Sequence, residues 1–210
     1  MKNIVVLVSG GGTNLQALID AQNSGIIRSG RIVCVISSKA GAYALERAKN
    51  AGIEGVVLPR SEYADSHAYS KALLELLREK NADVIVYAGF MTILDEQVCD
   101  AYPYRMINVH PSLIPSFCGK GYYGLRVHEE ALARGVKVTG ATVHFVTAEC
   151  DAGPIILQKA VEIQAGDTPE VLQRRVMEQA EWKILPLATE YVCAGKITVE
   201  NGIARISDDI

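Results

Sequence analysis

The sequence predicts an α/β fold, in which a Rossmann-like, mostly parallel twisted sheet carries flanking helices and its later strands are partly antiparallel. Three observations support this prediction. Short runs rich in Val and Ile lack the apolar–polar alternation of a half-exposed strand, as expected when both faces of a parallel sheet are buried. Longer amphipathic segments separate these runs. After Pro115 the pattern changes to a glycine-rich loop and longer strand-like segments, the first of which alternates.

The first half of the chain alternates strands with helices. Strands are expected at the short apolar runs Ile4–Val8, Ile32–Ile36, Gly55–Leu58, Asp83–Ala88 and Met106–Val109. Helices are expected at the segments between them, Asn14–Ser24, Tyr43–Ala51, Ser66–Lys80 and Asp95–Tyr102. In the third helix Leu73, Leu74 and Leu77 share one face, which marks them as core residues.

In the second half of the chain the strands are predicted to be partly antiparallel. A helix is expected around Val127–Arg134, followed by strands at Thr139–Val146 and Pro154–Ile163. Thr168 and Pro169 suit the N-cap and first position of a last helix, which runs toward Leu185 or beyond. Pro186 is expected to kink or break that helix. Lys196–Val199 and Ile203–Ile206, joined through Asn201 and Gly202, form a terminal hairpin.

Composition restricts the class of protein. The 210 residues contain no internal repeat or low-complexity linker, so one domain spanning 1–210 is expected, with a phosphate-binding half at about 1–103 and a catalytic half at about 104–210. Lys+Arg 21 against Asp+Glu 24 gives a net charge of −3, which argues against nucleic-acid binding. The five cysteines form no C-x-x-C pair, so neither a disulfide framework nor a zinc knuckle is indicated. No signal peptide or transmembrane segment is evident, so we expect a cytoplasmic location and no membrane partner.

The segment Ser9–Leu15 follows the first strand and enters the first helix. Glycines allow close backbone approach to an anion, and a helix N-terminus supplies unpaired N–H groups, so phosphate binding is one interpretation. The other is a tight turn that merely requires glycine. A dinucleotide fingerprint is absent, because Leu15 stands where Gly or Ala is needed and Ser37–Lys39 provides no acidic residue. A Walker A motif is absent too, so a small phosphorylated substrate fits better than NAD or ATP.

The candidate catalytic residues are Asn108, His110 and Asp151. Residues 108 and 110 share one face of a strand, and Pro111 and Pro115 restrict the backbone after them. In attack of an amine on a carbonyl, the Asn108 amide can donate to the developing oxyanion, and His110 can donate or move protons. Asp151 can raise the histidine pKa, set its tautomer or hold a relay water. Taken singly, each residue also fits a structural role; their combination favours acyl transfer.

Other histidines and cysteines give weaker signals. His67, His128 and His144 show no ligand spacing, so no metal site is predicted, and His144 is expected to be structural within its strand. A thiol nucleophile, Cys118 or Cys150 with His110 as its base, is an alternative interpretation, but no cysteine-enzyme signature surrounds either residue.

Several motifs together resemble the phosphoribosylglycinamide formyltransferase family. They are Val8–Ile19, Ala88–Leu94, Asn108–Pro115 and Thr142–Gly153. Asn108–Pro115 alone is similar to the wider folate-dependent formyltransferase superfamily. Val8–Ile19 narrows the resemblance to the phosphoribosylglycinamide formyltransferase family.

The resemblance implies a Rossmann-like enzyme that transfers formyl from 10-formyltetrahydrofolate, a co-substrate, to the amine of 5-phosphoribosylglycinamide in purine biosynthesis, without a metal. It implies that Asn108, His110 and Asp151 are catalytic. It also implies that Gly12, Thr13 and Asn14 hold the phosphate and that Glu181 binds the ribose hydroxyls. The implied folate-binding residues are Met91, Thr92, Ile93, Leu94, Ala148, Glu149, Cys150, Ala152 and Gly153.

Two features depart from the family pattern. Thr92 stands where Arg is expected in many members, and the stretch Phe117–Val127 is about five residues longer. The longer loop is expected to be a lid, a folate-tail contact or a surface elaboration. Alternative functions are a formyltetrahydrofolate hydrolase and a non-catalytic phosphosugar-binding protein; a methionyl-tRNA formyltransferase would need a further RNA-binding domain. A monomer or a homodimer is expected.

Overall fold

A computed structural model describes residues 1–207 of the chain. Its strands are β1 (Lys2–Val8), β2 (Gly30–Ser37), β3 (Glu54–Val57), β4 (Val84–Tyr87), β5 (Met106–His110), β6 (Val138–Phe145), β7 (Ile155–Glu162), β8 (Ile197–Glu200) and β9 (Ile203–Ile206). Its helices are α1 (Thr13–Asn23), α2 (Tyr43–Asn50), the 3₁₀ turn η1 (Arg60–Glu62), α3 (Ser66–Glu79), α4 (Glu96–Ala101), α5 (Leu125–Arg134), α6 (Pro169–Val176), the π-helical η2 (Met177–Glu181) and α7 (Trp182–Cys193).

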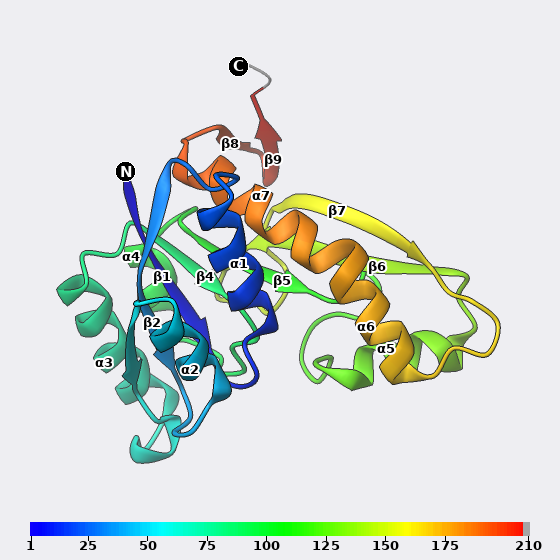
Figure 1. The fold of residues 1–210 in the computed structure, drawn as a ribbon, viewed down its shortest axis with the longest axis horizontal. Helices are drawn as coiled ribbons and strands as arrows, with labels where there is room; N and C mark the ends of the chain where they lie inside the picture. Colours follow the sequence, from blue (N-terminus) through cyan, green and yellow to red (C-terminus); the bar gives the residue numbers. More distant parts are fainter. Residues whose placement is uncertain (208–210) are drawn as a thin grey trace.

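Seven strands form one twisted sheet in the order β3-β2-β1-β4-β5-β6-β7 (Figure 1). The first five are parallel, whereas β6 runs antiparallel to β5, and β7 runs antiparallel to β6. The predicted fold class is therefore confirmed, including the partly antiparallel later strands. The hairpin β8–β9 forms a separate two-stranded sheet, as predicted from Asn201 and Gly202.

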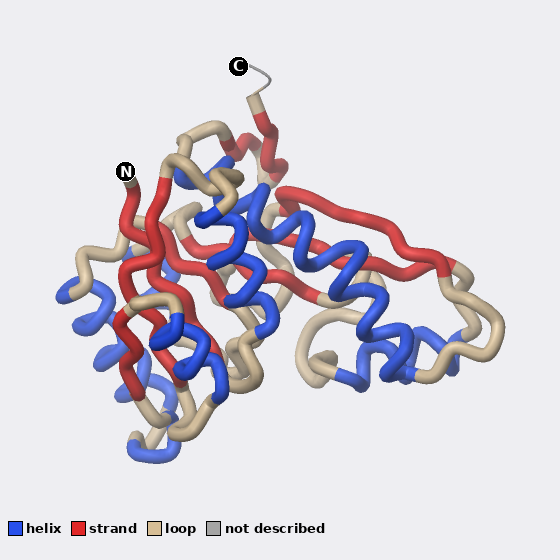
Figure 2. The backbone as a smooth tube through the Cα atoms, in the orientation of Figure 1, coloured by secondary structure: helices blue, strands red, loops and turns tan. Residues whose placement is uncertain are grey.

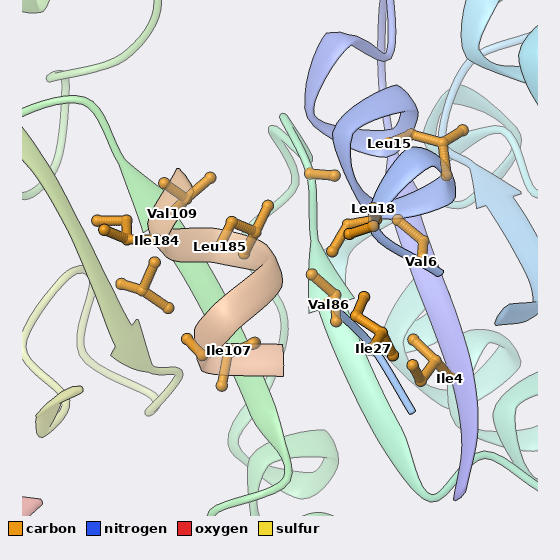
Figure 3. Close-up of a cluster of buried hydrophobic side chains, with 14 of the residues drawn as sticks. Ile4, Val6, Leu15, Leu18, Ile27, Val86, Ile107, Val109, Ile184 and Leu185 are labelled. Carbon is orange, nitrogen blue, oxygen red and sulfur yellow. The ribbon is translucent and has the colours of Figure 1, made fainter. Parts of the chain in front are cut away.

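Two hydrophobic clusters, one on each face, cover the parallel strands. Ile4 and Val6 of β1 belong to the cluster under α1 and α7, and Val5 and Leu7 belong to the cluster under α3. Because alternate residues of one strand enter different clusters, the strand needs apolar residues throughout, which explains the missing alternation. Figure 3 shows part of the first cluster, with labelled side chains Ile4, Val6, Leu15, Leu18, Ile27, Val86, Ile107, Val109, Ile184 and Leu185.

The strand order reverses between β1 and β4, since the chain moves outward through β2 and β3 before returning to β4. Ligands of open α/β sheets bind at the carboxyl ends of strands beside such a reversal. The loops after β1, β4 and β5 all leave the sheet at this edge. The antiparallel pair β6–β7 extends the sheet away from it; α6, η2 and α7 pack against this pair, and α5 packs against α6 (Figure 2).

Pro186 was expected to kink or break the last helix, and the helix is not broken there. Pro186 lies inside α7, which continues to Cys193. A proline ring crowds the carbonyl four residues earlier, here that of Trp182. Trp182 is the first residue of α7, directly after the π-helical segment η2. The irregularity therefore falls at η2, where the wider coil meets the α-helix, and the helix continues past the proline. None of the helices within residues 1–207 is long and apolar enough to cross a membrane.

Candidate active site

Asn108 and His110 lie at the carboxyl end of β5, where the antiparallel partner β6 adds a second histidine. Asn108 pairs with His144 in the ladder, and His110 pairs with Thr142. The Asn108 Nδ2 atom lies 3.2 Å from His144 Nε2. His144 is buried, as expected of a structural residue, but it also belongs to the candidate site, which the sequence analysis missed. Only the register between β5 and β6 places His144 beside Asn108, and a single sequence does not reveal that register.

Asp151 is brought to these side chains by a tight loop after β6. Its backbone is left-handed, with φ of 55°, a conformation that Asp adopts more readily than most residues. Two residues later, a Cβ on Gly153 would lie 1.8 Å from the Phe145 carbonyl oxygen, so only glycine fits. The Phe145 N–H donates to the Pro154 carbonyl across the base of the loop at 2.9 Å. The loop is thereby closed upon the strand that carries His144.

The Asp151 carboxylate lies between the two histidines. Its Oδ2 is 3.4 Å from His110 Nδ1, and its Oδ1 is 3.5 Å from His144 Nε2. The Gly119 N–H also donates to Oδ2 at 2.9 Å. Burial alone would raise the pKa of Asp151, but His144, His110 and the Gly119 N–H together lower it to about 2. Asp151 is therefore ionised at neutral pH.

The hydrogen-bond partners of the histidines fix where a proton can go. His110 Nε2 lies 2.8 Å from the Phe117 carbonyl oxygen, and His144 Nδ1 lies 2.9 Å from the Phe145 carbonyl oxygen. A carbonyl only accepts, so each of these nitrogens carries hydrogen, and in the neutral ring the other nitrogen does not. Burial lowers the pKa of His110, although Asp151 opposes this. His110 Nδ1 and His144 Nε2 are thus the ring nitrogens that face the carboxylate, so a proton that reaches this cluster can be shared between a ring nitrogen and Asp151.

Asn108 has one amide hydrogen that remains available. Its Nδ2 group has two hydrogens, and the contact with His144 Nε2 uses one of them. The Asn108 residue is only half-buried, so the second hydrogen can reach a ligand. Side-chain amides in this role stabilise an oxyanion by roughly 2.7–4 kcal/mol.

The longer loop after Pro115 contacts the candidate catalytic residues directly. Phe117 accepts from His110 and Gly119 donates to Asp151, so the start of the loop is part of the site rather than only a surface elaboration. Cys118 and Cys150 lie beside these residues. Burial, reinforced by the nearby Asp151 charge, raises the pKa of the Cys118 thiol, and it raises that of Cys150 to about 11. Both remain thiols at neutral pH, which argues against either as the nucleophile.

The glycine loop presents the N-terminus of α1. Gly12 caps the helix in a left-handed conformation, with φ of 73°, and a Cβ there would lie 2.7 Å from Ala44 Cβ. Glycine is therefore required by the turn itself, and the phosphate interpretation does not depend on the residue type alone. Thr13 is exposed at the first turn, whose N–H groups have no partner within the helix. The turn alone therefore accounts for the glycine, and phosphate binding stays a prediction.

Glu181 reaches this loop from the other end of the chain. Asn14 Nδ2 donates to Glu181 Oε2 at 2.7 Å, and Asn14 Oδ1 is buried without a partner. Glu181 is the last residue of the π-helical segment η2, an irregularity that is frequent at functional sites. Burial raises the pKa of Glu181 to about 7, and the Asn14 hydrogen bond limits that rise. Asn14 and Glu181, which the resemblance assigns to the phosphate and the ribose hydroxyls, are thus in direct contact.

The residues expected around a folate lie in two loops. In the loop after β4, Met91 and Ile93 are exposed, Thr92 is half-buried and Leu94 is buried. The second loop contributes Glu149, Cys150, Ala152 and Gly153 to a cavity of about 670 Å³ that also includes Asp151. Ala148 is exposed and does not line that cavity, and Met91–Leu94 do not line it either. Of the two loops expected around a folate only the second lines this cavity, and of the candidate catalytic residues only Asp151 does.

The chemistry of the site does not include a recognisable metal-binding group. Within residues 1–207, His, Cys, Asp and Glu side chains form no group of three with metal-binding geometry. At Asp151, the two histidines approach different carboxylate oxygens and have committed their other nitrogens to carbonyls.

Comparisons with known proteins agree with these features. A model of the formyl transferase family matches residues 2–189. Phosphoribosylglycinamide formyltransferase of Escherichia coli (strain K12) is 42% identical over 202 residues, which cover 96% of this chain and 92% of that protein. The trifunctional purine biosynthetic protein adenosine-3 of Bos taurus is 43% identical over 208 residues, and the chain spans 20% of its length. The structure of glycinamide ribonucleotide transformylase 1 from Symbiobacterium toebii matches with a TM-score of 0.93 and 43% identity, covering 99% of this chain and 95% of that one.

Proposed function

The chain belongs to the formyl transferase family, and we propose that it transfers the formyl group of 10-formyltetrahydrofolate to the amine of 5-phosphoribosylglycinamide. The products are formylglycinamide ribonucleotide and tetrahydrofolate, and the reaction belongs to purine biosynthesis. The observation that carries the proposal is the placement of Asp151 between two basic ring nitrogens, beside an amide donor. A binding protein has no need of that arrangement, whereas an amine that attacks a carbonyl must lose a proton.

The ribonucleotide is proposed to bind across the α1 N-terminus and Glu181. Gly12, Thr13 and Asn14 present backbone N–H groups and the positive end of the helix dipole to the phosphate. Glu181, once ionised, accepts from the ribose hydroxyls, while its bond to Asn14 fixes its orientation. The backbone N–H groups suit a phosphate and the carboxylate suits hydroxyls, so the two parts together suit a ligand that is both a phosphate ester and a sugar.

The folate is proposed to lie along the two loops after β4 and β6. Exposed Met91 and Ile93 offer apolar contact to its ring system, with Thr92 and Leu94 completing that segment. Residues Ala148–Gly153, except the catalytic Asp151, form the opposite side. The formyl carbonyl then points toward Asn108, which lies beside β4 in the sheet, paired with Tyr87.

The proposed reaction begins when the neutral glycine amine attacks the formyl carbon. The carbonyl π electrons move to oxygen, and the second amide hydrogen of Asn108 stabilises that charge. The ammonium proton passes to the cluster formed by Asp151, His110 and His144. The intermediate collapses when the bond between the formyl carbon and N10 breaks, and N10 recovers a proton from the same cluster. One proton is thus accepted and returned, so the cluster ends in its starting state.

A spectrophotometric assay with 10-formyltetrahydrofolate tests this proposal directly. We expect tetrahydrofolate to form only when 5-phosphoribosylglycinamide is present. Folate turnover without the ribonucleotide would identify a hydrolase, in which water replaces the amine. Absence of turnover in both cases, with thermal stabilisation by the ribonucleotide, would instead support a non-catalytic phosphosugar-binding protein.

A further inference from the structure

The Ser9 side chain joins the ends of three strands. Ser9 directly follows β1, and its Oγ lies 2.6 Å from the Oγ of Ser38, which directly follows β2. The same Ser9 Oγ accepts the N–H of Met91, beyond the end of β4, at 3.0 Å. Ser9 and Ser38 are 6% and 5% exposed, so these contacts are shielded from water. The Ser9 hydroxyl therefore links the segments that follow β1, β2 and β4, beside the point where the strand order reverses.

This contact links two segments that the proposed function assigns to different substrates. On one side, Ser9 leads into the glycine loop that receives the phosphate. On the other side, Met91 begins the apolar segment that receives the folate. The ladder between β1 and β4 ends before this point, with the Ala88 N–H donating to the Leu7 carbonyl. Beyond the last backbone hydrogen bond between β1 and β4, the Ser9 side chain provides a further hydrogen bond between the two segments that follow these strands.

The segment 89–94 has little else to fix its backbone. It is irregular, and within residues 1–207 the Met91 N–H provides the one hydrogen bond found for its backbone N–H groups. Phe90 and Leu94 anchor its two ends in the core, whereas Met91 and Ile93 point outward. Irregular segments with few hydrogen bonds open at low free-energy cost. The buried Ser9 Oγ, which accepts the Met91 N–H, therefore contributes strongly to the stability of this segment.

We propose that Ser9 is a positioning residue that holds the folate-binding segment 89–94 in register with the phosphate-binding loop. The inference rests on the proposed function for the identity of the two ligands. Because Ser9 is only 6% exposed, it acts through the Met91 N–H. Removal of its hydroxyl should therefore affect folate binding selectively, whereas a residue that only stabilises the fold would lower the melting temperature without distinguishing the substrates.

The test compares Ser9→Ala with Ser9→Thr and Ser38→Ala. Ser9→Ala deletes the acceptor, Ser9→Thr keeps a hydroxyl, and Ser38→Ala removes the neighbouring hydroxyl while leaving Ser9 to accept from Met91. Loss of one such bond corresponds to about a three- to tenfold rise in KM for 10-formyltetrahydrofolate. We expect that rise in Ser9→Ala, recovery in Ser9→Thr, and changes below about twofold for Ser38→Ala and for the KM of the ribonucleotide.

A second measurement does not depend on turnover. Hydrogen–deuterium exchange of the unliganded protein should show faster exchange at residues 89–94 in Ser9→Ala than in Ser38→Ala. Equal exchange in the two variants, or an equal change in KM for both substrates, would overturn the proposal. If the wild-type protein transfers no formyl group, the proposed function fails, and the exchange comparison still decides whether Ser9 holds the segment.

Discussion

Glu181→Gln is expected to stabilise the protein and weaken substrate binding at the same time. Burial raises the pKa of Glu181 from 4.5 to about 7 in the folded protein. A group with a raised folded pKa contributes its full stability below pH 4.5 and loses it as pH rises through 7. The difference between the two pKa values corresponds to about 3 kcal/mol of unfolding free energy. Gln has no charge to bury, and its oxygen can still accept from Asn14.

The variant should therefore match the wild type near pH 4.5 and exceed it by up to about 3 kcal/mol at pH 8. Urea unfolding at pH 5 and pH 8 measures this difference. Glu178→Gln is the matched control, because Glu178 is an exposed carboxylate in the same π-helical segment. Equal pH responses of Glu181→Gln and wild type between pH 5 and 8 would refute the reasoning.

Binding should change in the opposite direction. A carboxylate accepts from two ribose hydroxyls, and replacing one such charged bond costs about 1.5–3 kcal/mol, so KM for the ribonucleotide should rise about 10- to 100-fold. In the wild type that KM should also fall as pH rises through 7, when Glu181 ionises. The variant should lack this component, while the ionisation of the substrate phosphate affects both proteins equally. An unchanged KM would remove Glu181 from the ribose site.

Four further variants have defined expected outcomes. Asp151→Asn should lower kcat about 10²- to 10⁴-fold with little change in either KM, because the amide cannot take part in proton transfer; steady-state kinetics measure the split. The same variant should lose the stability that Asp151 provides above pH 4, a contribution that in the wild type disappears as pH falls from 3.8 to about 2, which acid unfolding detects. Asn108→Ala should reduce kcat about 10²- to 10³-fold, as seen in single-turnover assays, and a loss below tenfold would exclude an oxyanion role. Thr13→Asp should mainly raise KM for the ribonucleotide through charge repulsion, whereas equal KM values would place the phosphate elsewhere. Cys118→Ser should keep kcat within about twofold, since its raised pKa leaves the thiol uncharged; inactivation would restore the thiol mechanism.

Local signals in the sequence were sufficient for most of the fold. Uninterrupted Val and Ile runs identify strands buried on both faces, and Thr168 with Pro169 marks the start of α6, where Thr168 Oγ1 accepts from the Val171 N–H at 3.4 Å. These features depend on neighbours within about one turn or one strand, which a single sequence contains. The alternation in Thr139–Val146 predicted a half-buried strand, which is wrong, because residues Thr139–Phe145 of β6 are all buried and β7 is the strand with exposed residues.

The candidate site depends on contacts between distant residues. Asn108 and His110 were recognisable because they are two residues apart on one strand. His144 was not, because its place beside Asn108 is set by the antiparallel register of β5 and β6. The same applies to the loop after Pro115, whose contacts with His110 and Asp151 follow from tertiary folding. The break considered at Pro186 is absent, and the π-helical segment that precedes α7 was not visible in the pattern.

That π-helical segment places the requirements of folding and of recognition in opposition. A π coil accommodates one residue more than an α-helix of the same course, so a chain shortened by one residue in Met177–Glu181 could run as an uninterrupted α-helix. The regular version would turn Glu181 by about 100° away from Asn14, since each helical residue advances by that angle. Selection for thermal robustness alone would favour the shorter helix, and selection for ligand capture would retain the longer one. In protein engineering, this segment is therefore the part of the scaffold that idealisation should leave untouched.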